Sequence, residues 1–80
     1  MNQSGADDLS SIGVDELIVS AAASLASLGY SKLEAKDLGQ AKQAIDALQS
    51  LLPHVSEDHR ADLQQALTGL QVAFVTAGSS

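Results

Sequence analysis

The sequence predicts an all-α domain, a three-helix antiparallel bundle that dimerises. Hydrophobic residues make up 45% of the 80-residue chain but aromatic residues only 2%, so the core must consist of Leu, Ile, Val and Ala, which suit packed helices. Three stretches repeat apolar residues at spacings of three and four, the helical period. Short polar connections separate these stretches, which favours antiparallel neighbours.

The first helix is expected near residues 14–28, after a disordered tail at 1–10. Ser10 or Ser11 is the candidate cap, and Gly29 is the expected terminator because glycine accepts the left-handed conformation. The expected core face has helical spacing and consists of Val14, Leu17, Ile18, Ala21, Leu25 and Leu28.

The second helix is expected near 38–52 and the third near 57–76, within a domain covering 11–77. Asp37 and Gln40 have capping-box spacing, and Pro53 ends the second helix. Ser56 introduces the third helix, and Gly78 ends it before a tail at 78–80. The predicted core residues of these two helices are Leu38, Ala41, Ile45, Leu48, Leu52, Leu63, Leu67, Leu70 and Phe74.

Apolar residues beyond these core faces predict a second interface. A helix that is apolar nearly all round is normally buried on more than one side. The alternative is that exposed alanine is simply a good helix former. We favour an interface with a second copy or another helical protein, and its predicted residues are Val19, Ala22, Ala23, Ala26, Val72 and Val75.

The net charge of −6 excludes the partners that basic proteins usually bind. Four Lys and Arg residues among ten Asp and Glu give little affinity for nucleic acid or an anionic membrane. The apolar stretch 17–28 is too short to span a bilayer, and acidic residues precede it where a signal peptide is basic. We expect a cytoplasmic protein.

The sequence predicts no catalytic residue and no cofactor. The chain has no cysteine, and no nucleophile motif or glycine-rich phosphate loop is present. His54, His59 and Asp62 crowd the start of the third helix. Acidic residues there suit the helix dipole, and whether these three side chains bind a metal stays open.

Two single residues have alternative roles. Asp46 is four residues after Lys42, a spacing that predicts an exposed ion pair, with a contact to a backbone amide or a partner as the alternative. Tyr30 is expected to cover the end of the bundle with its hydroxyl in solvent, and the alternative role is an anchor for a partner.

The run from Asp37 to Leu48, DLGQAKQAIDAL, resembles the D-L-x-x-A-K-x-x-I-D-x-L signature of a small bacterial helical family, catalogued as a domain of unknown function. Leu17-Ile18-Val19-Ser20 and Ala26-Ser27-Leu28-Gly29 are also similar to that family, so the resemblance covers 15–52. After Leu52 the chain departs from the family's Lys-Thr-x-Gly-Asn-Leu connection. The resemblance implies a bacterial cytoplasmic all-α protein and transfers no catalytic residue.

These features predict a non-enzymatic helical interaction module, a self-associating adaptor or accessory subunit. The alternative is an acidic regulator that docks on a basic surface of a translation- or DNA-associated protein. A small metal- or ligand-binding bundle is the third hypothesis.

Overall fold

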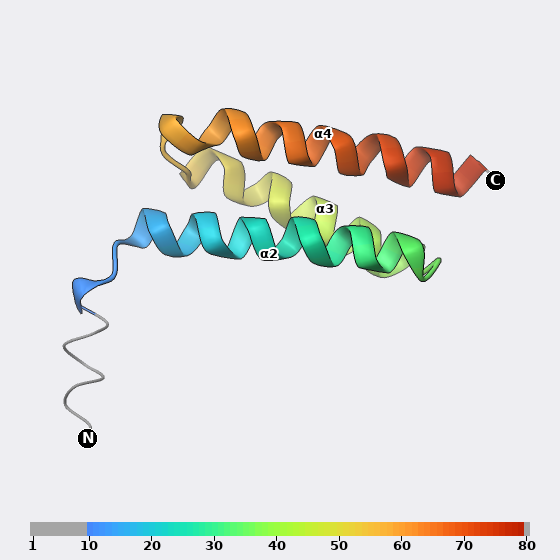
Figure 1. Ribbon diagram of the computed structural model, residues 1–80, viewed down its shortest axis with the longest axis horizontal. Helices are drawn as coiled ribbons and strands as arrows, with labels where there is room; N and C mark the ends of the chain where they lie inside the picture. Colours follow the sequence, from blue (N-terminus) through green and yellow to red (C-terminus); the bar gives the residue numbers. More distant parts are fainter. Residues whose placement is uncertain (1–9, 80) are drawn as a thin grey trace, which may run out of the picture.

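The computed structural model describes residues 10–79 as three long helices (Figure 1). They are α2 (Val14–Glu34), α3 (Leu38–Leu51) and α4 (Glu57–Ser79), and a 3-10 turn, η1 (Leu52–His54), follows α3. No strand occurs within residues 10–79. The all-α prediction is therefore confirmed, while the tail predicted at 1–10 lies outside the described residues except for Ser10.

The three helices alternate in direction along the chain, as the short connections predict. Figure 1 shows α3 running back between α2 and α4, so that α2 and α4 point the same way. The start of α4 therefore lies beside the start of α2, where Ser56 donates hydrogen bonds to Asp15. Each helix contacts the other two.

The core is aliphatic, as the composition predicts. Leu48, Leu70 and Val55 are its largest fully buried side chains. The predicted core residues of α3 and α4 are confirmed, with Leu38 and Phe74 packed at the edge. On α2, the predicted core residues Ile18 and Leu25 pack against the core, but the predicted core residues Val14, Leu17, Ala21 and Leu28 are exposed. The buried residues of α2 are Ala22, Gly29 and Leu33.

Gly29 does not end the first helix, which is where the sequence prediction was wrong. It lies inside α2, is buried, and has an ordinary negative φ. A Cβ added there would lie 3.0 Å from Leu70 Cδ2 and 3.6 Å from Ala44 Cβ. Gly29 therefore allows α2 to approach both other helices closely. The packing gained by this close approach outweighs the poor helix propensity of glycine.

α2 ends at Glu34 with Ala35 as its C-cap, and the next residue, Lys36, adopts the left-handed conformation with φ 64°. The amide of Lys36 donates to the Leu33 carbonyl at 3.0 Å, and the amide of Asp37 donates to the Lys32 carbonyl at 2.9 Å. These two bonds form a Schellman motif, which satisfies carbonyls at the end of the helix. A lysine thus occupies a position that usually favours glycine.

The other helix ends partly follow the predictions. Asp37 caps α3, because its Oδ1 accepts from the Gln40 amide at 3.2 Å, and α3 ends at Leu51, two residues before Pro53. The N-cap of α2 is Gly13, without a side-chain hydrogen bond, in place of Ser10 or Ser11. Gly78 does not end α4, which continues to Ser79, so the tail predicted at 78–80 is helical up to that residue.

Replacing Gly29 with valine should destabilise the bundle, because the branched side chain has no space beside Leu70. Overpacking of this kind costs about 1–3 kcal/mol, measurable by urea unfolding followed by circular dichroism. Gly39→Ala is the matched control, since its Cβ would meet only Asp37 Oδ1 at 3.9 Å. This control should gain up to about 1 kcal/mol from helix propensity; equal effects of the two changes would show that Gly29 is not a packing constraint.

Replacing Lys36 with glycine should stabilise the fold, because glycine has no Cβ to clash in the left-handed conformation. The expected gain is about 1 kcal/mol, seen as a higher urea midpoint with an unchanged slope. Lys36→Ala keeps the Cβ while removing the charge and should show no such gain. A glycine variant no more stable than the alanine variant would contradict the Schellman assignment.

Candidate interaction surface

The structure places half of the predicted interface residues inside the chain's own bundle. Ala22 is fully buried, and Val19 and Ala26 pack against the core. The prediction that a second chain covers these three residues was wrong, since α3 and α4 already do so. Ala23, Val72 and Val75 are exposed, and their place in an interface stays a prediction.

The core face of α2 was predicted wrongly in part because the helix is longer than the sequence prediction made it. A helix that ended at Gly29 would centre its core face on Leu17, Ala21 and Leu28. The observed helix continues to Glu34, and its core face includes Gly29 and Leu33, which rotates that face by roughly a quarter turn at 100° per residue. The apolar period running through Gly29 to Leu33 is the signal that predicts this face.

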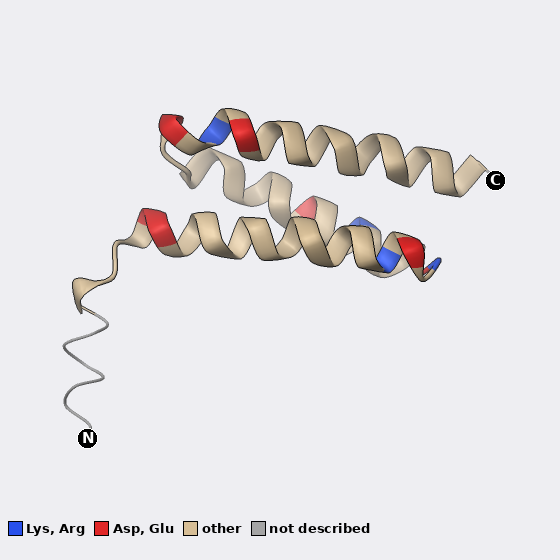
Figure 2. Cartoon of the chain, in the orientation of Figure 1, with Lys and Arg blue, Asp and Glu red and all other residues tan. Residues whose placement is uncertain are grey.

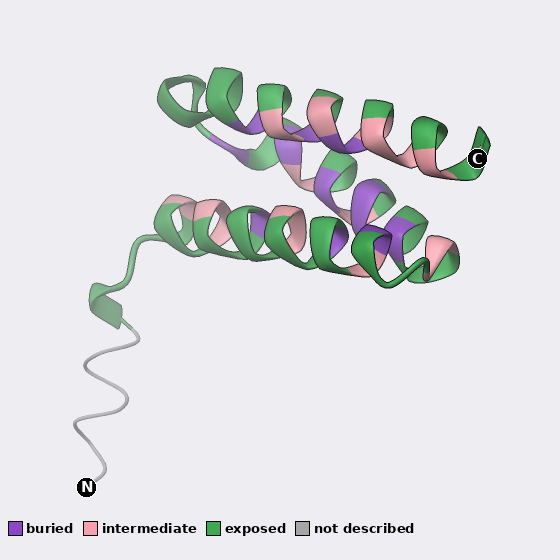
Figure 3. Cartoon of the chain, turned by 45° about the vertical axis from the view of Figure 1, so that its right-hand side comes forward, coloured by how far each residue is buried: buried purple, intermediate pink, exposed green. Residues whose placement is uncertain are grey.

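The rotation leaves an apolar strip on the outside of α2, which we call the α2 strip: Val14, Leu17, Ala21 and Leu28. The exposed fractions are 72% for Val14, 60% for Leu17 and 50% for Leu28. Figure 3 shows this outer side of α2 as exposed along most of its length. The spacing of seven residues from Val14 to Ala21 and from Ala21 to Leu28 is that of a coiled-coil seam.

A shallow groove lies beside the α2 strip, between α2 and α3. Its volume is about 190 Å³. Aliphatic carbons of Leu25, Leu28, Ala44 and Ala47 line it, and Lys32, Gln40 and Gln43 add polar groups. An apolar hollow with polar groups around it can receive a single aliphatic side chain.

A second apolar area lies on α4, away from the α2 strip. Val72 and Val75 are 61% and 64% exposed. They line a shallow hollow together with Thr68, Gln71 and Thr76. This area holds two of the predicted interface residues, and threonine and glutamine surround them.

The charged residues of α2 lie near its two ends and those of α4 lie near its start, whereas α3 carries Lys42 and Asp46 along its length (Figure 2). No Asp, Glu, Lys or Arg occurs between Leu17 and Ser31 or from Leu63 to Ser79. The starts of α2 and α4 carry carboxylates, and Asp15 there accepts from the Ser56 amide at 2.8 Å and from Ser56 Oγ at 3.2 Å. The charge-free middle of α2 is the part that bears most of the α2 strip.

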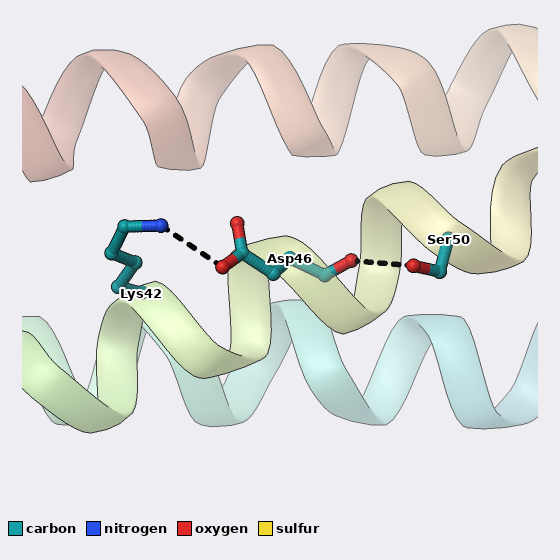
Figure 4. A network of polar contacts seen from close by, with 3 residues as sticks. All are labelled: Lys42, Asp46 and Ser50. Atoms are coloured by element: carbon teal, nitrogen blue, oxygen red, sulfur yellow. Dashed lines mark hydrogen bonds and ion pairs between the residues drawn. The ribbon is translucent and has the colours of Figure 1, made fainter.

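Asp46 forms the ion pair that its spacing predicts. Lys42 Nζ lies 3.0 Å from Asp46 Oδ2, and both side chains are about 60% exposed (Figure 4). Ser50 Oγ donates to the Asp46 carbonyl at 3.0 Å. Exposed pairs of this kind contribute under about 1 kcal/mol, so Asp46 marks the solvent face of α3.

Tyr30 does not cover the end of the bundle. It lies within α2 and is 44% exposed. Its hydroxyl would be 2.7 Å from a Cβ added at Gly69, so the ring reaches across to α4. Gly69 provides the space for this contact, and the role of Tyr30 as a partner anchor stays a prediction.

The residues considered for metal binding do not assemble into a site within residues 10–79. No group of three or more His, Asp or Glu side chains with metal-binding geometry occurs in that range. His54, His59 and Asp62 are all exposed. Arg60, which lies between the latter two, donates from Nη2 to the Val55 carbonyl at 2.7 Å and holds the connection to α4.

Comparison with known proteins gives no match to a family model, to a curated protein or to a solved structure. The resemblance of 15–52 to a bacterial helical family therefore stays a prediction. None of the helices described within residues 10–79 is both long and apolar enough to cross a membrane.

Replacing Asp15 with alanine should weaken the junction between the starts of α2 and α4. Two solvent-exposed hydrogen bonds from Ser56 to the Asp15 carboxylate are lost, at a cost of about 0.5–1.5 kcal/mol, measured by urea unfolding. Glu16→Ala removes the same charge from the neighbouring exposed position and should change the stability by less than about 0.5 kcal/mol. Equal losses would assign the effect to charge alone.

Proposed function

We propose that this protein is a non-enzymatic helical interaction module that self-associates through the α2 strip. The single observation that carries the proposal is the exposure of Val14, Leu17 and Leu28 on one face of α2. Large aliphatic side chains in a row along a helix gain free energy when a partner covers them. The proposal includes the cytoplasmic setting and the bacterial family that the sequence predicts.

The chemistry of α2 favours another helix as the partner. Small residues, Ala21 and Ser24, separate the large ones along the same exposed side, so a second helix can approach closely. The absence of charge between Leu17 and Ser31 within this helix removes the desolvation cost of burying an ion. A second copy offers the same strip, and two-fold pairing of identical surfaces is the commonest form of oligomer.

The size of the surface indicates a weak association. The 21 residues of α2 span about 31 Å at 1.5 Å per residue. One helix face of that length is smaller than the ~800 Å² per partner of a standard interface. The oligomeric state should therefore depend on concentration.

Replacing Leu17 and Leu28 together with glutamate should abolish self-association, because it places charges within the proposed interface. Sedimentation velocity over a series of concentrations should show the wild type forming dimers and the variant staying monomeric. Val72→Glu with Val75→Glu adds the same charge to α4 and is the matched control. Circular dichroism should show all three proteins equally helical.

Three outcomes decide the proposal. Loss of dimers only in the α2 variant supports it. Loss only in the α4 variant would transfer the interface to Val72 and Val75. A wild type that remains monomeric at every concentration would refute self-association.

A second candidate function is docking on a basic surface, and the clustering of carboxylates supports it. Glu16, Glu57 and Asp58 are exposed at the adjoining starts of α2 and α4. Such an association would weaken steeply as salt screens the charges. Dimers formed by the α2 strip should persist at high salt, so the salt dependence separates the two functions.

A further inference from the structure

We propose that two copies pair antiparallel along α2, with Leu17 of each copy entering the groove beside Leu28 of the other. The inference rests on the proposed self-association and specifies its geometry. The partner is thus a second copy of this chain, and the α2–α3 groove becomes part of the interface.

The spacing of the α2 strip sets the register. In an antiparallel pair of identical helices related by a two-fold axis, the residue numbers of any two residues that face each other add up to the same value. A sum of 45 places Leu17 opposite Leu28, Ala21 opposite Ser24, and Val14 opposite Ser31, all exposed positions. Large residues then meet at two places, and small residues meet at the axis, where the helices are closest.

The groove gives Leu17 a place to bind. It opens beside Leu28, the residue that this register sets opposite Leu17 of the second copy. Leu25, Ala44 and Ala47 provide apolar contacts within its volume of about 190 Å³. Because of the two-fold symmetry, each Leu17 occupies the groove of the other copy. Since the groove is formed by α2 and α3, the contact then includes α3 as well as α2.

The distribution of charge favours antiparallel over parallel pairing. Asp15 and Glu16 lie in the first turn of α2, and Lys32 lies in its last turn. Lys32 also lines the groove, on the side of the α2 strip. Antiparallel pairing brings this lysine near the acidic first turn of the second copy, whereas parallel pairing sets like charges together. Glu34, Lys36 and Asp37 also lie at the lysine end, so that end carries no net charge, and antiparallel pairing is favoured because it keeps the two acidic first turns apart.

Cysteine cross-linking tests the orientation, since the natural chain contains no cysteine. Val14→Cys and Ser31→Cys change exposed residues that the register sets opposite each other. The two variants are mixed under reducing conditions and then oxidised, and disulfide-linked dimers are quantified by gel electrophoresis. A mixture of Ser31→Cys with Gln65→Cys, an exposed position on α4, gives the background from random collision.

Antiparallel pairing predicts a cross-linked product from the mixture at several times the background, and background levels from either variant alone. In that arrangement two copies of position 14 are about 25 Å apart along the axis, 17 residues at 1.5 Å. Efficient cross-linking of either variant with itself would overturn the proposal in favour of parallel pairing. Background levels in every mixture, with a wild type that still dimerises, would overturn the geometry but leave the proposed function intact. A wild type that sediments only as a monomer would overturn both.

Discussion

The close contact of α2 with α3 and α4 at Gly29 determines the rest of the structure. Leu70 and Ala44 occupy the space in which a side chain at this position would lie. Because a Cβ at this position would lie only 3.0 Å from Leu70 Cδ2, glycine allows the closest approach, and the face of α2 that carries Gly29, with Ala22 and Leu33, points inward. Leu17 and Leu28 lie on the other side of the helix and therefore point outward. One packing constraint in the core thus also accounts for the apolar surface.

The orientation of α2 about its own axis therefore determines both which of its residues enter the core and which form the candidate surface. The buried positions in the middle of α2, Ala22 and Gly29, are small, and small residues allow close packing but bury little apolar area. Ile18, Val19 and Leu25 pack on the core at its edge. Large aliphatic residues of the same helix stay in solvent, which is unfavourable for a monomer of this size. A second copy that covers them would recover that free energy without any change in the bundle.

The sequence was sufficient to predict the helices and most of the core. The core faces of α3 and α4 followed from Ile45, Leu48, Leu63 and Leu67, whose large side chains repeat at helical spacing. The face of α2 was predicted only in part, because Ile18 and Leu25 do pack against the core, whereas alanine and glycine on one side compete with Leu17 and Leu28 on the other. Hydrophobicity ranks Leu17 above Ala22 for burial, whereas the actual choice depends on which face lets three helices approach, a property of the assembled bundle. The contact between Asp15 and Ser56 joins residues 41 positions apart, and it likewise needs the fold to be known.

The most direct measurement of the central claim is the solvent accessibility of individual methyl groups as the protein concentration is raised. Methyl NMR with a soluble paramagnetic agent reports this accessibility for Leu17 and Leu28, with Val72 and Val75 as internal references in the same sample. The account predicts that the two leucines become protected at high concentration while the two valines remain accessible. Leucine methyl groups that stay fully accessible while the protein associates, or protection confined to the valines, would contradict it.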